Sequence, residues 1–296
     1  MRRRRPPGTP FMHADRRLIQ PGRLPIGALL LVVAGLVVGC SGANHPERVA
    51  KTTTGAVRAK LSGIEQQRDD LVQFRARTPI DLIVESFAGD VVVIADPGIE
   101  VTTVQLVREA HHGYLRGFEP VQALEYLSWN ARLDPGPGPV ETLRIETNYS
   151  GPEPWYMRAH LRIETPRLDR VRVRTTRGLV SVRNNTGPVD IETNLGDVTI
   201  ATRHPLRDAV RILVSEGSVD YRVPGGSTGE LDLAVVDGSI QLRVTEGRLR
   251  FTDGPNDEQM VNAVLDDGRN PLLIRTTEGD IRIAVVEEPL SFGPWR

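Results

Sequence analysis

The segments Gly178-Leu179-Val180-Ser181-Val182 and Gly196-Asp197-Val198-Thr199-Ile200 show the pattern that decides the fold. Each has a glycine, a variable residue, and then alternating apolar and polar residues. This alternation is typical of a β-strand with one buried face, and the glycine permits a tight turn before the strand. The pattern begins at Gly178, Gly187, Gly196, Gly217, Gly229, Gly238, Gly247 and Gly279. The repeats predict short strands that are joined by turns and stacked on one another.

A longer period accompanies the short one. The glycines at 178, 187, 196 and 217 recur 51 residues later, at 229, 238, 247 and 268. A fixed period of this length predicts stacked supersecondary units. Asn270 and Pro271 interrupt the strand that should follow Gly268, which indicates an edge or a bulge at that point.

Composition agrees with an all-β chain. The 296 residues include 28 Gly and 22 Pro, and only 5% are aromatic, which predicts many turns and a thin core of Val, Ile and Leu. Residues 1–39 hold seven Arg and one Asp, so residues 40–296 carry a net charge of −7. Nucleic-acid binding needs clustered positive charge, so we expect no nucleic acid among the partners.

The N-terminal residues 1–39 are expected to be a signal peptide rather than part of the fold. A basic segment precedes the thirteen-residue apolar run Ile26 to Val38, which is short for a membrane-spanning helix. The run leads into Val37-Val38-Gly39-Cys40, which resembles a bacterial lipobox, and Cys40 is the only cysteine. The resemblance implies a lipoprotein with acyl chains such as palmitate on Cys40, and Ser41 favours the outer membrane where the cell has one. An ordinary signal sequence or a membrane anchor with an incidental cysteine is the alternative.

The remaining chain divides into four expected parts. Residues 40–70 are polar and predict a flexible tether. Residues 71–165 form an N-terminal β region, in which Glu119 to Trp129 predicts a small helix with Pro120 near its start. Residues 166–288 are the repeat region, and 289–296 a C-terminal cap or tail. Because the end coils of a stack need covering, we expect caps from Ser41 to Val107 and from the tail Glu287 to Arg296.

No residue pattern predicts a catalytic, cofactor or metal site. Adjacent histidines such as His111-His112 point to opposite faces of a strand, so a solvated pair is expected, and likewise solvated His160 and His204. Acidic residues before repeat glycines could line an edge for calcium or a basic partner, or be solvated turn residues: Glu216, Asp237, Glu246, Asp267 and Glu278. Trp129 and Trp155-Tyr156 could stack on a sugar, although packing is the favoured role.

The repeats resemble a widespread bacterial family whose members are named "putative adhesin" and contain a domain of unknown function. The resemblance covers residues 80–286 and depends on Gly89-Asp90-Val91-Val92-Val93, on Leu161 to Pro166 and on the glycine repeats. It implies a right-handed β-solenoid-like stack of short strands, commonly exported or membrane-tethered. No catalytic residue is implied.

We therefore expect a lipid-anchored envelope protein that acts as a non-enzymatic scaffold or interaction module. Its partners would be the membrane, through Cys40, and an envelope protein or polysaccharide. The alternative is a β-helix protein that binds or cleaves polysaccharide, which would collect charged residues on one face. The outward positions instead mix both signs with neutral residues, as a solubilising surface does: Asp190, Glu192, Thr199, Asp220, Asp232, Gln241, Arg250 and Arg282.

Overall fold

A computed structural model describes residues 64–69, 71–76, 79–111, 120–135, 140–293 and 295. All of them belong to one compact unit. The expected signal peptide, Cys40 and His112 lie outside the described residues. Among the described residues, no helix has both the length and the apolar character needed to cross a membrane.

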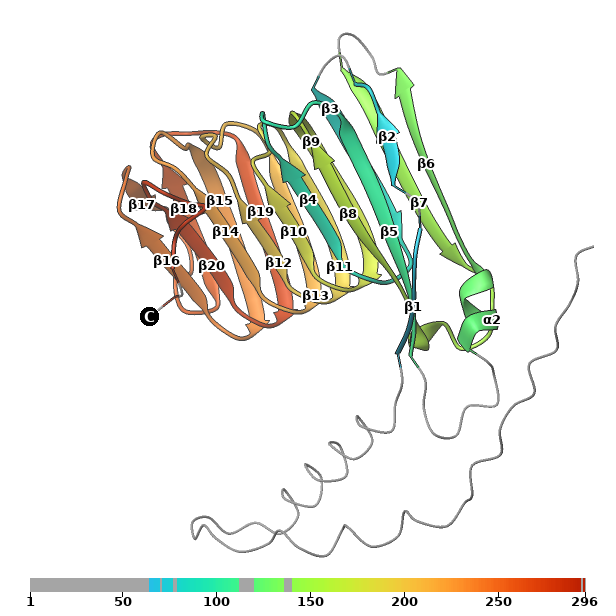
Figure 1. Ribbon diagram of the computed structural model, residues 1–296. Helices are drawn as coiled ribbons and strands as arrows, with labels where there is room; N and C mark the ends of the chain where they lie inside the picture. Colours follow the sequence, from blue (N-terminus) through green and yellow to red (C-terminus); the bar gives the residue numbers. More distant parts are fainter. Residues whose placement is uncertain are drawn as a thin grey trace, which may run out of the picture. The chain divides into compact units, whose positions relative to one another are not determined.

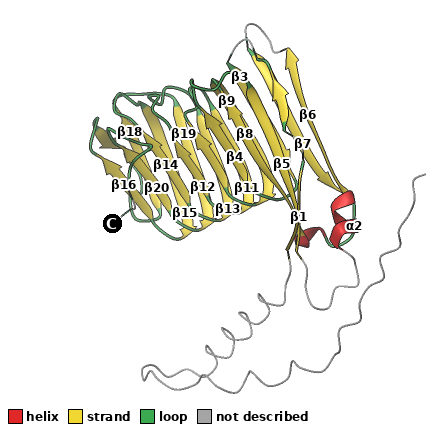
Figure 2. Ribbon diagram, in the orientation of Figure 1, coloured by secondary structure: helices red, strands yellow, loops and turns green. Residues whose placement is uncertain are grey.

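Two ten-stranded β-sheets face each other across one apolar core (Figures 1 and 2). Sheet A consists of β1 (Ile64–Arg68), β2 (Val72–Phe74), β4 (Val91–Ala95), β5 (Thr102–His111), β8 (Met157–Thr165), β10 (Val180–Arg183), β12 (Val198–Ala201), β14 (Val219–Val223), β16 (Ile240–Val244) and β20 (Ile281–Val285). Sheet B consists of β3 (Ile80–Ser86), β6 (Leu127–Pro135), β7 (Glu141–Tyr149), β9 (Leu168–Arg177), β11 (Val189–Leu195), β13 (Val210–Glu216), β15 (Gly229–Asp237), β17 (Leu249–Phe251), β18 (Met260–Leu265) and β19 (Pro271–Glu278).

Each coil of the stack is one sheet B strand followed by one sheet A strand, and neighbouring coils pair in parallel. A tight turn joins the two strands in every coil except β7/β8, where residues 150–156 connect them. In space the coils follow the order β7/β8, β3/β4, β9/β10, β11/β12, β13/β14, β19/β20 and β15/β16. The coil β3/β4 therefore lies between two coils that follow it in the chain. At the other end, β19/β20 lies between β13/β14 and the earlier coil β15/β16.

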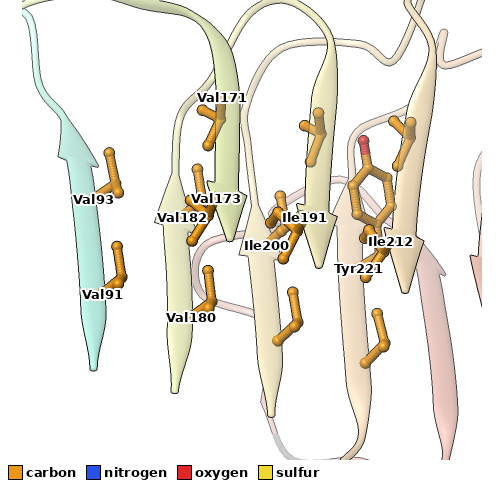
Figure 3. Packing of buried hydrophobic residues seen from close by; sticks show 14 of the residues in the cluster. Val91, Val93, Val171, Val173, Val180, Val182, Ile191, Ile200, Ile212 and Tyr221 are labelled. Carbon is orange, nitrogen blue, oxygen red and sulfur yellow. The ribbon is translucent and has the colours of Figure 1, made fainter. Parts of the chain in front are cut away.

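The core is built from rows of apolar side chains that are in register from coil to coil. Val93, Val182, Ile200 and Tyr221 form one such row across sheet A, and all are buried (Figure 3). Burial raises the pKa of the Tyr221 phenol. Residues between the inward positions point outward, so the alternation in the sequence separates core from surface.

A ladder of glycines holds the turns together. The turn from sheet B to sheet A contains a glycine with a φ between +117° and +148°, in the spatial order Gly89, Gly178, Gly196, Gly217, Gly279 and Gly238. A Cβ on Gly178 would overlap the carbonyl oxygen of Gly89, and a Cβ on Gly196 would overlap that of Gly178. Both the positive φ and the close approach of neighbouring backbones require glycine here.

Antiparallel strands cover both ends of the parallel stack. β5 pairs with β8 and carries β1 and β2, while β6 pairs with β7. At the other end, β18 pairs with β15, and β17 pairs with β18. Because β1 already begins at Ile64, the segment expected to be a tether contributes to the N-terminal cap.

The structure corrects the expected helix and shows where the C-terminal tail packs. The helix α2 covers only Pro120–Glu125, because Leu127 and Trp129 belong to β6 and pair with Tyr149 and Thr147 of β7. The described part of the C-terminal tail packs on the outer face of sheet A. The Phe292 ring lies 5.3 Å from the Arg222 guanidinium on β14 and 5.1 Å from that of Arg243 on β16, the edge strand of the last coil.

The all-β, solenoid-like fold is confirmed, but the 51-residue period does not relate equivalent strands. It aligns β11 of sheet B with β16 of sheet A, and the parallel strand β13 with the antiparallel strand β18. The repeating unit is one coil, and Gly178, Gly196 and Gly217 mark successive coils.

We expect Gly196→Ala to lower the free energy of unfolding by about 3 kcal/mol. The methyl group would overlap the Gly178 carbonyl oxygen, and alanine is strained at the φ of +137°. Chemical denaturation measures this change. Gly226→Ala is the control, since Gly226 also has a positive φ of +74° but no atom within 4 Å of an added Cβ. The control should cost about 1 kcal/mol. Equal losses in both variants would contradict a role for the close approach.

Candidate functional site

The glycine turns form one edge of the stack, at the bottom of Figure 1, which we call the glycine edge. It comprises the turns at Gly89, Gly178, Gly196, Gly217, Gly279 and Gly238. Sheet B strands end there and sheet A strands begin there. Each turn places the residue after its glycine beside the same residue of the next coil.

Side chains along the glycine edge bind the backbone of the neighbouring coil. Asp90 Oδ1 accepts a hydrogen bond from the Leu179 amide at 2.9 Å, and Asp197 Oδ1 accepts one from the Ser218 amide at 2.8 Å. Ser218 Oγ in turn accepts the Asp280 amide at 3.1 Å. We call this row the polar ladder; its last member is Asp280, which accepts the Ser239 amide at 3.0 Å. Only Leu179 interrupts the row, since its side chain has no acceptor for the Asp197 amide.

His160 on β8 is the first member of the polar ladder. Its Nδ1 atom lies 3.2 Å from the Asp90 amide nitrogen and 3.2 Å from Asp90 Oδ2. The Nε2 atom lies 3.6 Å from Glu109 Oε2 on β5. A neutral Nδ1 accepts a hydrogen bond from the Asp90 amide, whereas a protonated Nδ1 donates one to the Asp90 carboxylate. The His160 ring therefore makes a hydrogen bond to Asp90 in either protonation state.

The Glu109 carboxylate, almost fully buried, completes a cluster with His160. It accepts a hydrogen bond from Gln66 Nε2 on β1 at 2.6 Å and lies 2.5 Å from His111 Nε2. Arg158 Nε lies 3.9 Å from the same carboxylate. The cluster therefore joins β1, β5 and β8, which are the strands that cover the N-terminal end of sheet A.

The cluster shifts the pKa of three groups. The hydrogen bond to Asp90 is the largest cause of the raised pKa of His160, and Glu109 adds to it. The pKa of Asp90 is lowered, chiefly by its hydrogen bond with His160. Desolvation is the largest single influence on Glu109, but the hydrogen bond from Gln66 and the two histidines together lower its pKa.

Solvated roles for His111 and His160 were wrong, because both contact Glu109, whereas His204 is exposed as expected. The partners of His160 are distant in sequence, so spacing alone does not indicate them. A signal nevertheless existed. Ala159-His160-Leu161-Arg162-Ile163 repeats the pattern of Gly89-Asp90-Val91-Val92-Val93, and strand pairing aligns the two segments.

The outer face of sheet B carries ion pairs that cross from strand to strand. Asp190 accepts from Arg172 at 3.0 Å and from Arg211 at 2.9 Å, which links β9, β11 and β13. Arg275 of β19 pairs with Asp232 of β15 at 2.7 Å. These outward residues are paired with neighbours and form a charged surface of mixed sign.

A shallow hollow of about 320 Å³ interrupts this surface at the ends of β11, β13, β19 and β15. Its lining combines small polar and apolar groups: Asn194, Leu213, Ser215, Ala234, Val236 and Thr277. Glu192 and Arg275 also line it. Val236 is 70% exposed, so the hollow presents apolar surface to solvent. The arrangement can hold a ligand against a rigid four-strand floor.

The acidic residues before glycines do not form one row. Glu216, Glu278 and Asp237 are in register on adjacent strands. Glu246 instead accepts the Gly225 amide, and Asp267 pairs with Arg250. Among the described residues, no group of three or more His, Cys, Asp or Glu could hold a metal ion.

The aromatic candidates separate in the structure. Trp129 is partly buried against the core, as a packing residue is. Trp155 is 57% exposed beside Tyr156, with ring centroids 6.0 Å apart, in the short helix η1 (Pro154–Tyr156). Neither lies in the hollow of sheet B.

Comparisons with known proteins find one family model and several solved structures that this chain is similar to. The family model described as Toastrack DUF4097 matches residues 157–284, from β8 to β20, which confirms the resemblance to a family with a domain of unknown function. A "putative cell adhesion protein" from Clostridium sporogenes aligns over 74% of this chain and 99% of its own, with 9% identity and a TM-score of 0.45. A "putative adhesin" from Bacteroides fragilis aligns over 75% and 97%, with 10% identity and a TM-score of 0.26. No curated protein sequence matches the chain.

We expect His160→Gln to lower stability most at mildly acidic pH. The folded pKa of His160 is raised, so its contribution is complete below about pH 6.5 and is lost as the pH rises through the folded pKa. The lowered pKa values of Asp90 and Glu109 keep both carboxylates ionised at pH 5.5, and their contribution is lost only as the pH falls further. Urea denaturation should show a loss on the order of 1 kcal/mol at pH 5.5 and a smaller loss at pH 8. His204→Gln is the control, and a pH-independent loss in His160→Gln would contradict the assignment.

Proposed function

From the match of residues 157–284 to the Toastrack family, we propose that this chain is a non-enzymatic, adhesin-like interaction module of the bacterial cell envelope. The hollow on the outer face of sheet B carries the proposal. It joins four strands whose register is held by the glycine ladder and by ion pairs. A rigid floor with mixed polar and apolar groups suits binding of a macromolecular surface, because little conformational entropy is lost on association.

We propose that a lipid on Cys40 holds the module at the membrane. Support comes from the basic segment, the apolar run Ile26 to Val38 and the lipobox-like Val37 to Cys40. More than one acyl chain on the cysteine would give a stable anchor. In this proposal residues 1–39 are removed, and the residues between Cys40 and β1 connect the anchor to the stack.

A polysaccharide is the second candidate partner. Thr176, Asn194, Ser215 and Thr277 occupy adjacent strands of sheet B at neighbouring outward positions. Their spacing follows the distance between strands, about 4.8 Å, so hydroxyl and amide groups recur regularly. Such a row could donate and accept hydrogen bonds along a sugar chain.

We expect Ser215→Arg to reduce binding of the purified protein to isolated envelope at least about tenfold, because the long side chain fills the hollow. Co-sedimentation with envelope fractions measures binding, and digestion of either the protein or the polysaccharide component identifies the partner class. Thr199→Arg, on the outer face of sheet A, is the matched control. Unchanged binding in Ser215→Arg would remove the hollow from the proposal.

We expect the membrane-fraction protein to carry a diacylglyceryl mass increment that Cys40→Ala lacks. Intact-mass spectrometry measures it directly. Cys40→Ala should also move the protein from the membrane to the soluble fraction, since the acyl chains supply most of the membrane affinity. An unmodified wild-type mass would exclude the lipid anchor and leave the binding role of sheet B to be tested separately.

A further inference from the structure

Exposed apolar side chains gather at the N-terminal part of the glycine edge. Five of the nine large apolar residues exposed in the described part of the chain lie there: Val121 (59%), Tyr126 (43%), Trp155 (57%), Leu179 (39%) and Leu195 (41%). We call these five the apolar edge patch. In Figure 1, α2 and the turns of the neighbouring coils lie at this same lower edge.

A ring contact and hydrogen bonds link the segments that carry the patch. The Tyr126 and Tyr149 rings are 6.5 Å apart, and the Tyr149 hydroxyl donates to the Pro152 carbonyl oxygen at 2.8 Å. Pro152 leads into η1, where Arg177 donates to the Pro154 carbonyl oxygen at 2.9 Å. Gly178, which follows β9, donates its amide to the Leu195 carbonyl oxygen at 2.7 Å. These segments therefore follow one another along the edge, from α2 past η1 to the turns after β9 and β11.

Two members of the patch replace polar residues of equivalent coils. The position after the ladder glycine is Asp90, Asp197, Ser218, Asp280 or Ser239 in the other coils, but Leu179 in the coil β9/β10. Leu179 thereby forgoes the hydrogen bond that a polar side chain would accept from the next turn. The position before the ladder glycine is charged in four other coils, at Arg177, Glu216, Glu278 and Asp237, and is the buried Ala88 in the coil β3/β4. In the coil β11/β12 it is the exposed Leu195.

The chain reaches the stack at this edge. β1 begins with Ile64, which pairs with His111 at the end of β5, and α2 packs against both strands. Between Cys40 and Ile64 lie 23 residues, which span at most about 80 Å when fully extended. An anchor on Cys40 would therefore be attached to the stack at the edge that carries the patch.

We propose that the apolar edge patch docks onto the lipid surface to which the chain is anchored, an inference that depends on the proposed lipid anchor. Trp and Tyr favour the interface between headgroups and acyl chains, and exposed Leu and Val add apolar area. The row before the ladder glycines differs between the two parts of the edge. It contains Ala88, Arg177 and Leu195 in the N-terminal part, and Glu216, Glu278 and Asp237, which anionic headgroups repel, in the C-terminal part. The N-terminal part of the edge therefore faces the bilayer, and the hollow of sheet B lies beside it.

Quenching of Trp155 fluorescence by brominated lipid tests the docking. The full acylated chain is inserted into vesicles of brominated phosphatidylcholine, with Trp129→Phe and Trp295→Phe leaving Trp155 as the only tryptophan. We expect at least about twofold quenching relative to unbrominated vesicles. Leu195→Asp and, independently on α2, Val121→Asp should remove most of it. Phe251→Asp, at the opposite end of the stack and 57% exposed, is the matched control and should leave quenching unchanged.

Each other result has a defined meaning. Unquenched Trp155 in a chain whose mass proves acylation of Cys40 overturns the docking and leaves the anchor intact. If Cys40 is not acylated, the proposed lipid anchor is wrong, and flotation of the unmodified chain with phosphatidylcholine vesicles then tests the docking. Flotation of the wild-type chain that is lost in Leu195→Asp supports the docking. A wild-type chain that does not float with the vesicles overturns it. Light scattering of the protein without vesicles tests for a dimer. If the protein is a dimer in which Trp155 is already shielded from solvent, the docking proposal is overturned and a second copy of the chain covers the patch.

Discussion

The close approach of backbones at the glycine turns sets the register of the whole stack. Because Gly178 contacts the Gly89 carbonyl and Gly196 contacts that of Gly178, neighbouring coils have little freedom to slide along the strand direction. A slip of one residue would also move every inward side chain to the surface. Fixed register then aligns equivalent residues in straight rows. The core row that contains Tyr221, the polar ladder and the ion pairs around Asp190 are three consequences of that single constraint.

The order of winding makes the stack more cooperative than a simple linear solenoid. In such a solenoid each repeat contacts its neighbours in the chain, so segments can form and fray separately. Here β19/β20 separates β13/β14 from β15/β16, although β15 follows β14 directly in sequence. The coil β15/β16 therefore lacks its parallel neighbour until β19 and β20, the last strands in sequence, have formed. At the other end, β3/β4 gains its second neighbour only when β7/β8 and β9/β10 have both formed. Contacts so distant in sequence favour slow, concerted folding.

The sequence predicts the strands well because their signal is local. Alternation in Val180-Ser181-Val182 identifies both the strand and its buried face. The order of the coils leaves no such signal, since rows of Val and Ile are interchangeable partners, and the apparent 51-residue period aligns strands from different sheets. The helix near Glu119 is shorter than its pattern because β7 provides a pairing partner for Leu127 and Trp129. His160 was missed for the related reason that Asp90 and Glu109 approach it only in the folded stack, while the hollow of sheet B depends on four strands being in register.

Regularity itself indicates where this surface is specialised. Many charged outward residues of the stack serve a neighbour: carboxylates accept amides of the next turn, and arginines bridge adjacent strands. Evolution of a purely structural scaffold should keep such pairs, because each contributes to stability and none conflicts with folding. Leu179 and Val236 serve no neighbouring coil in this way, and they lie in the apolar edge patch and the hollow of sheet B, respectively. The two sites adjoin, since Asn194 lines the hollow and Leu195 belongs to the patch, so a partner in the hollow would bind directly beside the edge proposed to contact the membrane.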